Sequence, residues 1–137
     1  MSTIPATRTI SWEINTSPSD STCDKTGLTF ESFRDQVVAT KNMTVKVPTS
    51  RYYETWDSIT VEAVDGVVTV GHLLQTIYER YQKPLTIEEM EKYYELCEEW
   101  GYVPIGSSVL GECMGDLIVY EGLDELEDGV YELMLGS

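Results

Sequence analysis

Two runs of hydrophobic residues at helical spacing lie between Thr69 and Gly101. In the first run the apolar positions are three or four residues apart, as in a helix with one face toward a core: Val70, Leu73, Leu74, Ile77, Tyr78 and Tyr81. The second run has the same spacing at Ile87, Met90, Tyr93, Tyr94, Cys97 and Trp100. This pattern predicts two amphipathic helices joined by a short turn, with the flanking strands packed on their apolar faces.

The residues at the ends of these runs predict where each helix begins and ends. Thr69 is expected to cap the first helix by accepting a hydrogen bond from a backbone N–H. Pro84 is expected to end that helix at or before Lys83. Thr86 followed by Glu89 has the spacing of a capping box at the start of the second helix. Gly101 fits the left-handed position that ends many helices.

Alternating hydrophobic and polar residues predict strands on both sides of the helix pair. The expected strands are Thr9–Asn15, Met43–Val47, Ser58–Val64, Val67–Val68, Leu117–Tyr120 and Val130–Leu135. Asp65-Gly66 predicts a two-residue hairpin turn between two of them. The spacing of Phe30, Phe33 and Val37 predicts a further short helix within Thr29–Ala39.

The remaining segments are rich in turn-forming or acidic residues, and we expect them to be loops and turns. They are Thr16–Gly27, Pro48–Asp57, Tyr102–Gly115 with at most one short strand, and the acidic turn Leu123–Asp128. A chain of 137 residues favours one domain. We expect a loose N-terminal arm at residues 1–8 and a single domain at residues 9–137.

The order of these elements predicts an α+β domain with a mainly antiparallel sheet and the helix pair packed on one face. A hairpin followed at once by a helix is also typical of the β-grasp topology, which is the second interpretation of the fold.

The chain is strongly acidic, with 24 acidic and 9 basic residues and a formal net charge of −15. Nonspecific binding to DNA, RNA or anionic membranes depends on positive charge, so the sequence argues against direct contact with any of them. Basic protein partners are compatible with this charge. No run of apolar residues reaches the ~18 that a membrane-spanning helix needs.

The three cysteines, Cys23, Cys97 and Cys113, are widely spaced and odd in number. That usage fits reduced thiols inside a cell better than a disulfide framework. The first residues show no basic stretch followed by an apolar core, so no secretory signal is expected. We therefore expect an intracellular protein, in the cytoplasm or the nucleus.

Candidate catalytic and metal-binding groups match known site patterns poorly. The cysteines and His72 could supply four zinc ligands, but they lack the paired spacing of zinc sites. Cys113 is the best candidate nucleophile, yet Glu112 and Asp116 would raise its pKa and disfavour the thiolate. The sequence predicts no catalytic residue, metal ligand or cofactor site, and an enzyme with a nonstandard site near Cys113 is the second alternative function.

Three segments carry a resemblance to a known family: ATKNMTVKV, TWDSITVEAVDGVVTVGHLLQTIYERYQKPLTIEEME, and GDLIVYEGL with DGVYELML. They resemble a family of small domains of unknown function that is common in basidiomycete fungi, with relatives in large DNA viruses as a further expectation. The resemblance covers about residues 40–135 and is best over Val68–Met90. His72 and Tyr131 stand where the family often has Asp and Trp. The family implies no activity, so no functional residue is carried over from it; a viral relative would imply a virion component.

Two surfaces are candidates for partner binding. One is the Glu-rich side of the second helix, since charge steers and selects partners. The other is a loop whose Tyr and Arg residues are types enriched in binding hot spots, although Trp56 in that loop is expected to fold back over the core. The predicted contact residues are Glu88, Glu91, Lys92, Glu95, Glu98 and Glu99 on the helix, and Arg51, Tyr52 and Tyr53 in the loop.

The sequence therefore favours a non-enzymatic protein that acts by protein–protein contact, with a basic partner or with a second copy of itself, as an accessory structural component. The first alternative is an acidic mimic of nucleic acid that occupies a basic, histone-like protein. Mimicry should weaken at raised ionic strength, whereas an aromatic contact should persist.

Overall fold

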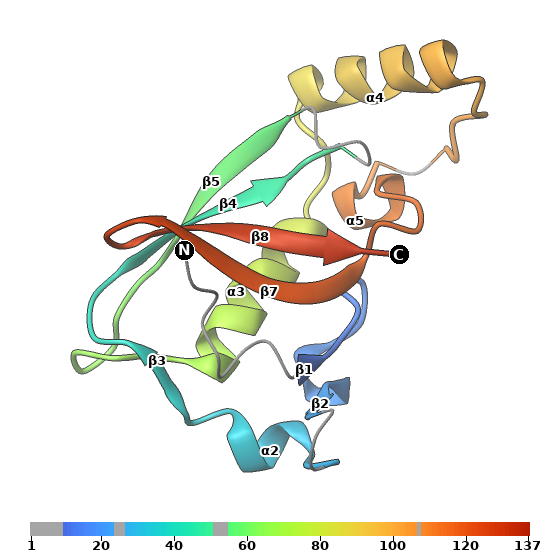
Figure 1. Cartoon of the computed structure of the whole chain (residues 1–137). Helices are drawn as coiled ribbons and strands as arrows, with labels where there is room; N and C mark the ends of the chain where they lie inside the picture. Colours follow the sequence, from blue (N-terminus) through green and yellow to red (C-terminus); the bar gives the residue numbers. More distant parts are fainter. Residues whose placement is uncertain (1–9, 24–26, 51–54, 107) are drawn as a thin grey trace.

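The computed structural model of the chain describes residues 10–23, 27–50, 55–106 and 108–137. Its main sheet has four strands in the order β5-β4-β8-β7 (Figure 1). The strands are β4 (Met43–Pro48), β5 (Trp56–Val61), β7 (Val119–Glu127) and β8 (Val130–Gly136). Both outer pairs are antiparallel hairpins, and the two central strands, β4 and β8, run parallel. The mainly antiparallel sheet of the predicted α+β fold is confirmed.

Helix α3 (Val70–Gln82) connects the two hairpins and packs against the sheet (Figure 1). In the β-grasp arrangement, two hairpins are joined through a helix on one face of the sheet, and the first and last strands pair in parallel. The structure has this order, which confirms that topology. Helix α4 (Ile87–Trp100) lies beyond the ends of β4 and β5. The shorter elements are η1 (Pro18–Asp20), α2 (Phe30–Phe33), α5 (Leu110–Cys113) and the two-stranded pairs β1–β2 (Ile10–Ser11, Thr22–Cys23) and β3–β6 (Val37–Ala39, Val68–Thr69).

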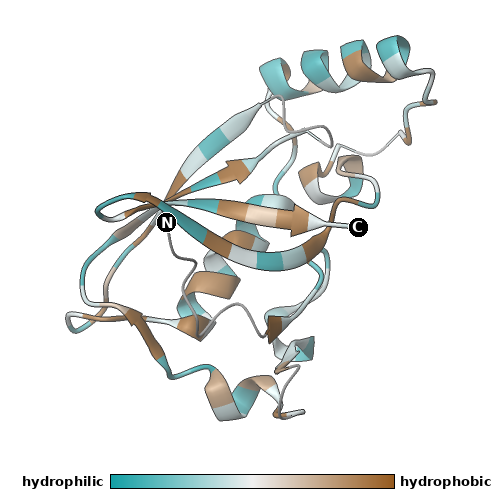
Figure 2. Cartoon of the chain, in the orientation of Figure 1, coloured by the Kyte–Doolittle hydropathy of each residue, from teal (hydrophilic) through white to brown (hydrophobic). Residues whose placement is uncertain are grey.

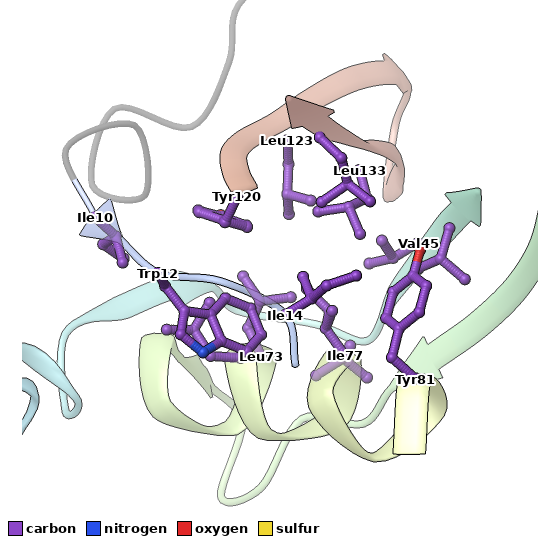
Figure 3. Close-up of a cluster of buried hydrophobic side chains, with 14 of the residues drawn as sticks. Ile10, Trp12, Ile14, Val45, Leu73, Ile77, Tyr81, Tyr120, Leu123 and Leu133 are labelled. Carbon is purple, nitrogen blue, oxygen red and sulfur yellow. The ribbon is translucent and has the colours of Figure 1, made fainter. Parts of the chain in front are cut away.

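The main core lies between α3 and the inner face of the sheet (Figure 3). Leu73 and Ile77 of α3 belong to one buried cluster with Val45 of β4, Leu123 of β7 and Leu133 of β8. All five side chains are fully buried. Burying such side chains contributes about 1.5–3 kcal/mol each, so this cluster is the main source of stability in the domain.

The segment that begins at β1 closes one end of this core (Figure 3). Ile10, Trp12 and Ile14 alternate with polar residues, as predicted, and all three are buried. Their backbone joins the start of β7, because the Ile14 N–H donates to the Ile118 carbonyl at 2.9 Å and the Tyr120 N–H donates to the Trp12 carbonyl at 2.8 Å. Of residues 10–15, only Ile10 and Ser11 form a regular strand, so the predicted strand Thr9–Asn15 extended too far. Thr9 and the arm predicted at residues 1–8 lie outside the described residues.

The local signals in the sequence are confirmed. The Thr69 hydroxyl accepts the His72 N–H at 3.3 Å, and Thr86 and Glu89 form both bonds of a capping box. Gly101 ends α4 with a φ of 75°. At the predicted hairpin turn, Asp65 and Gly66 have φ of 53° and 83°, which a two-residue turn of this type requires.

Two predictions for the outer segments were wrong. Leu123–Asp128 is not an acidic turn: β7 runs through it to Glu127, because its residues pair with β8 and bury Leu123. The helix predicted at Thr29–Ala39 ends at Phe33, and Val37–Ala39 forms β3 instead. Pairing of β3 with β6 and the β-branched side chains of this segment outweigh the helical spacing of its apolar residues.

Several loop boundaries also differ from the prediction. Thr16–Gly27 contains η1 and β2, and Tyr102–Gly115 contains the short helix α5. The loop expected at Pro48–Asp57 is shorter, because β4 reaches Pro48 and β5 begins at Trp56. β2 pairs with β1, and the Leu110 N–H at the start of α5 donates to the Lys83 carbonyl, contacts with other segments that local sequence signals do not encode. η1 is held by local bonds, such as that from the Ser21 N–H to the Pro18 carbonyl at 3.0 Å.

The two predicted helices differ in how much of their surface they bury. Helix α3 buries five residues, whereas α4 buries only Leu96 and Cys97. Figure 2 shows hydrophilic residues over much of α4, and α3 supplies the layer that covers the sheet. Of the predicted helix pair, α3 therefore holds the domain together, and α4 is an appendage at one end of the sheet.

Replacing Tyr81 with Phe tests how α3 is tied to the sheet. The buried Tyr81 hydroxyl donates to the Pro48 carbonyl at 2.6 Å. Because the variant leaves that buried carbonyl without this donor, the free energy of unfolding should fall by about 1–2 kcal/mol. Chemical denaturation measures the change, with Tyr78→Phe as the control, since no hydrogen bond of the Tyr78 hydroxyl occurs in the described part of the chain. An equal loss in both variants would contradict this assignment.

Candidate protein-binding surface

The α4 segment leaves and rejoins the body of the protein at adjacent points. The Leu85 N–H donates to the Ser108 carbonyl at 2.7 Å, and the Leu110 N–H donates to the Lys83 carbonyl at 3.0 Å. An antiparallel bridge between Pro84 and Val109 lies between these bonds. The backbone is therefore closed at the base of α4, and the helix with its return segment projects from that closure.

The inner face of α4 is held by a small set of contacts. Leu96 and Cys97 are buried, and the Tyr102 N–H donates to the Cys97 carbonyl at 2.9 Å beyond the end of the helix. The Tyr93 hydroxyl accepts the Ile105 N–H at 3.0 Å, which folds the return segment back along the helix. Few apolar contacts hold α4, so its position depends strongly on the polar contacts at its base.

Arg80 makes the principal polar contact at that base. Its guanidinium donates to Asp57 of β5 at 2.8 Å and to Glu89 of α4 at 2.5 Å. The side chains of Arg80 and Glu89 are only 10% and 12% exposed. Burial lowers the pKa of Arg80, but the two carboxylates outweigh it and raise the pKa above its ordinary value. Arg80 thus stays charged and joins α3, β5 and α4.

The structure brings the predicted acidic residues of α4 together on its outer face. With 3.6 residues per turn, five of them fall within an arc of about 100°. These residues, which we call the acidic face, are Glu88, Glu91, Glu95, Glu98 and Glu99, and all are exposed. Lys92, also predicted, lies at the border of the acidic face and pairs with Glu95 at 3.5 Å.

The structure describes only part of the loop that was predicted as the second binding surface. Arg51, Tyr52 and Tyr53 lie outside the residues that the structure describes. The prediction that Trp56 folds back over the core was wrong, because it is the first residue of β5 and is 43% exposed. Alternation along the strand places Trp56 on the outer side of the sheet, at a polar cleft of about 330 Å³ that also reaches Arg80.

Sequence reasoning missed that several apolar residues of α4 are exposed. Ile87 and Tyr94 were expected on the buried side of the helix, yet they are 79% and 49% exposed, and Trp100 is 53% exposed. The sequence held one signal: Ile87 and Tyr94 are seven residues apart, so they share the side of the helix that adjoins Glu91 and Glu98.

Cys113 lacks the properties of a nucleophile. Cys113 is 5% exposed, and burial, followed by the neighbouring Cys97 and Glu112, raises the pKa of the thiol to about 11. The cavity beside it, which Tyr93 and Cys97 also line, has a volume of about 10 Å³, roughly the room of one water. The raised pKa leaves almost no thiolate at neutral pH, and the small cavity leaves no space for a substrate.

Other site classes find little support in the described residues. No disulfide joins Cys23, Cys97 and Cys113 in the described part of the chain. Across residues 10–23, 27–50, 55–106 and 108–137, no three His, Cys, Asp or Glu side chains converge as a metal site would require. Within the same residues, no helix has the length and hydrophobicity to cross a membrane.

Replacing Arg80 with Gln should weaken the attachment of α4. Glu89 would remain nearly buried without its cation, so the free energy of unfolding should fall by about 2–3 kcal/mol, since breaking a buried ion pair exposes the cost of the remaining charge. Amide hydrogen exchange over residues 87–100 should also accelerate. The control, Lys41→Gln, breaks the exposed ion pair with Asp128 and should change neither measurement. Unchanged exchange in α4 would contradict the role of Arg80.

Alkylation by iodoacetamide tests the state of Cys113. With a pKa of about 11, its modification should be slow at neutral pH and should accelerate about tenfold per pH unit until the pH approaches that pKa. Mass spectrometry of the peptides follows each cysteine separately, and the half-exposed Cys23 serves as the internal reference. Labelling of Cys113 at neutral pH as fast as that of Cys23 would revive a reactive-thiol function.

Comparison with known proteins identifies a family. The model of a family of unknown function, DUF6699, matches residues 10–101, which run from β1 to the end of α4. The match begins earlier and ends earlier than the range of about 40–135 expected from the resemblance. No curated protein and no solved structure matches the chain. Because the matched residues make up more than half of its length, the chain belongs to this family of unknown function.

Proposed function

We propose that the protein is a non-enzymatic binding module that contacts a basic protein partner through the acidic face of α4. The observation that supports this proposal most directly is the exposure of five glutamates on one side of a helix that buries only two residues. The helix contributes little to the core, and its outer side is exposed from Glu88 to Glu99.

The charge of the chain favours the same partner class. A net charge of −15 attracts cationic surfaces over long range and repels nucleic acid and anionic membranes. Within α4, six glutamates stand against the single Lys92, and Glu98 and Glu99 lie at the helix end whose dipole disfavours them. A bound cationic partner would relieve that unfavourable charge.

Mimicry of nucleic acid is the second candidate. The acidic face extends from Glu88 to Glu99, about 16 Å along the helix axis, and so presents a linear array of carboxylates. A mimic would compete with nucleic acid for the partner's basic surface. A partner that binds α4 through a different surface from its nucleic-acid site would instead bind both at once.

We also expect an intracellular location and relatives in basidiomycete fungi, in line with the thiol usage and the resemblance.

A triple substitution tests the acidic face. Glu88→Gln, Glu91→Gln and Glu98→Gln together remove three charges from it, while the control triple Glu31→Gln, Glu62→Gln and Glu127→Gln removes three exposed charges elsewhere. Proteins captured from the native cells at about 50 mM and about 500 mM NaCl are identified, purified and titrated, because screening at high salt removes exposed charge contacts. The α4 triple should bind the captured basic protein about tenfold or more weakly, and the control should bind it as the wild type does.

Equal binding by the two triples would overturn the proposal, since overall charge and not the acidic face would then set affinity. Displacement of the protein from its partner by duplex DNA would favour mimicry. A captured partner that is retained at high salt and is indifferent to both triples would place the contact outside the acidic face.

A further inference from the structure

An exposed apolar strip runs beside the acidic face. Ile87, Met90 and Tyr94 lie at positions one, four and eight of α4, so they share one edge of the helix. Ile87 is 79% exposed and Tyr94 is 49% exposed, while Met90 is half-buried between them. The edge adjoins Glu91 and Glu98 on the outer side.

Exposed apolar residues also lie on the return segment, close to Tyr93. The rings of Tyr94 and Tyr93 pack at a centroid distance of 5.6 Å, and the Tyr93 hydroxyl accepts the Ile105 N–H. Ile105 is 55% exposed, and the nearby Val103 is 85% exposed. We name Ile87, Met90 and Tyr94 the apolar edge, which is bordered by carboxylates on one side.

We propose that the apolar edge and the acidic face together bind one amphipathic helix rich in lysine and arginine. This inference rests on the proposed function and specifies the partner's chemistry. Apolar side chains of the incoming helix would cover Ile87 and Tyr94, and its cationic flank would lie against Glu91, Glu95 and Glu98. Apolar burial would supply affinity that salt does not screen, and the charges would fix orientation.

The shape of the surface favours a helix over an extended segment. The apolar positions of α4 span two turns, about 10 Å, and a second helix with residues at i, i+3 and i+7 matches that repeat. The helix is also preorganised, because Thr86 caps its start and Gly101 terminates it. A partner docking there would meet a rigid rod, so little conformational entropy would be lost on this side of the interface.

Charge argues against a second copy of the chain as the occupant. Two α4 helices placed edge to edge would bring the five glutamates of each acidic face into one interface, with only Lys92 on each helix to compensate. Like charges at that spacing destabilise an interface and disfavour the wrong partner. A cationic helix satisfies the apolar edge and the acidic face at the same time.

Designed peptides of about 18 residues test the inference with the whole protein. One is an amphipathic helix of leucine, alanine and lysine with leucines at helical spacing, and the other has the same composition in a scrambled order. Fluorescence anisotropy measures affinity, and far-UV circular dichroism measures the helix that the peptide gains on binding. The amphipathic peptide should bind about tenfold or more tightly than the scrambled one and become helical, since only its leucines can line up with the apolar edge.

The double variant Ile87→Gln/Tyr94→Gln should remove that advantage while leaving the weak binding of the scrambled peptide unchanged. The control double variant Val37→Thr/Val64→Thr alters two residues that are 52% and 58% exposed away from α4, and it should bind both peptides normally. Circular dichroism of each variant checks that the protein fold is intact.

The outcomes separate this inference from the proposed function. Equal binding of the two peptides, sensitive to the glutamate triple but not to Ile87→Gln/Tyr94→Gln, would overturn the amphipathic helix and leave the acidic docking face standing. Binding that ignores both sets of substitutions would overturn both. A concentration-dependent dimer in sedimentation that the Ile87→Gln/Tyr94→Gln variant abolishes would show that a second copy covers the apolar edge, which also overturns the inference.

Discussion

The position of α4 depends on one buried cation. The guanidinium of Arg80 reaches from α3 to carboxylates on β5 and on the first turn of α4, and it does so where little apolar surface is available to hold the helix. A buried ion pair adds little net stability compared with apolar packing, but it strongly penalises arrangements in which its partners separate. Glu89 is therefore the one first-turn glutamate that serves the fold, and its neighbours on the outer side are free to face solvent.

Local chemistry explains which parts of the fold could be predicted from the sequence. The caps at Thr69 and Thr86, the left-handed Gly101 and the Asp65-Gly66 turn involve neighbouring residues only, and all are found where expected. The acidic stretch of β7 was assigned to a turn because Asp and Glu are disfavoured in strands, but its pairing with the neighbouring β8 outweighs that preference. The β3 strand was missed because its partner β6 is distant in the sequence. The central parallel pairing of β4 with β8 joins strands more than 80 residues apart, yet it completes the β-grasp order.

The candidate surface shows the same division. Helical periodicity alone grouped the glutamates of the acidic face correctly. It assigned Ile87 and Tyr94 to the core because both continue the apolar stripe, and only the position of α4 beyond the ends of the strands leaves them in solvent. Trp56 was misplaced for a related reason, since its exposure follows from strand alternation in a segment expected to be a loop. What a side chain faces depends on tertiary structure once its secondary structure is known.

The paired backbone at the base of α4 has an evolutionary consequence. Because Lys83 and Leu85 bond directly to Leu110 and Ser108, the segment between them begins and ends at nearly the same place. Length changes within that segment that keep the Arg80–Glu89 contact would leave the strand order and the main core unaltered, as insertions at closed surface loops generally do. Related chains could therefore keep the same sheet and core and change what they recognise by sequence changes within this one segment.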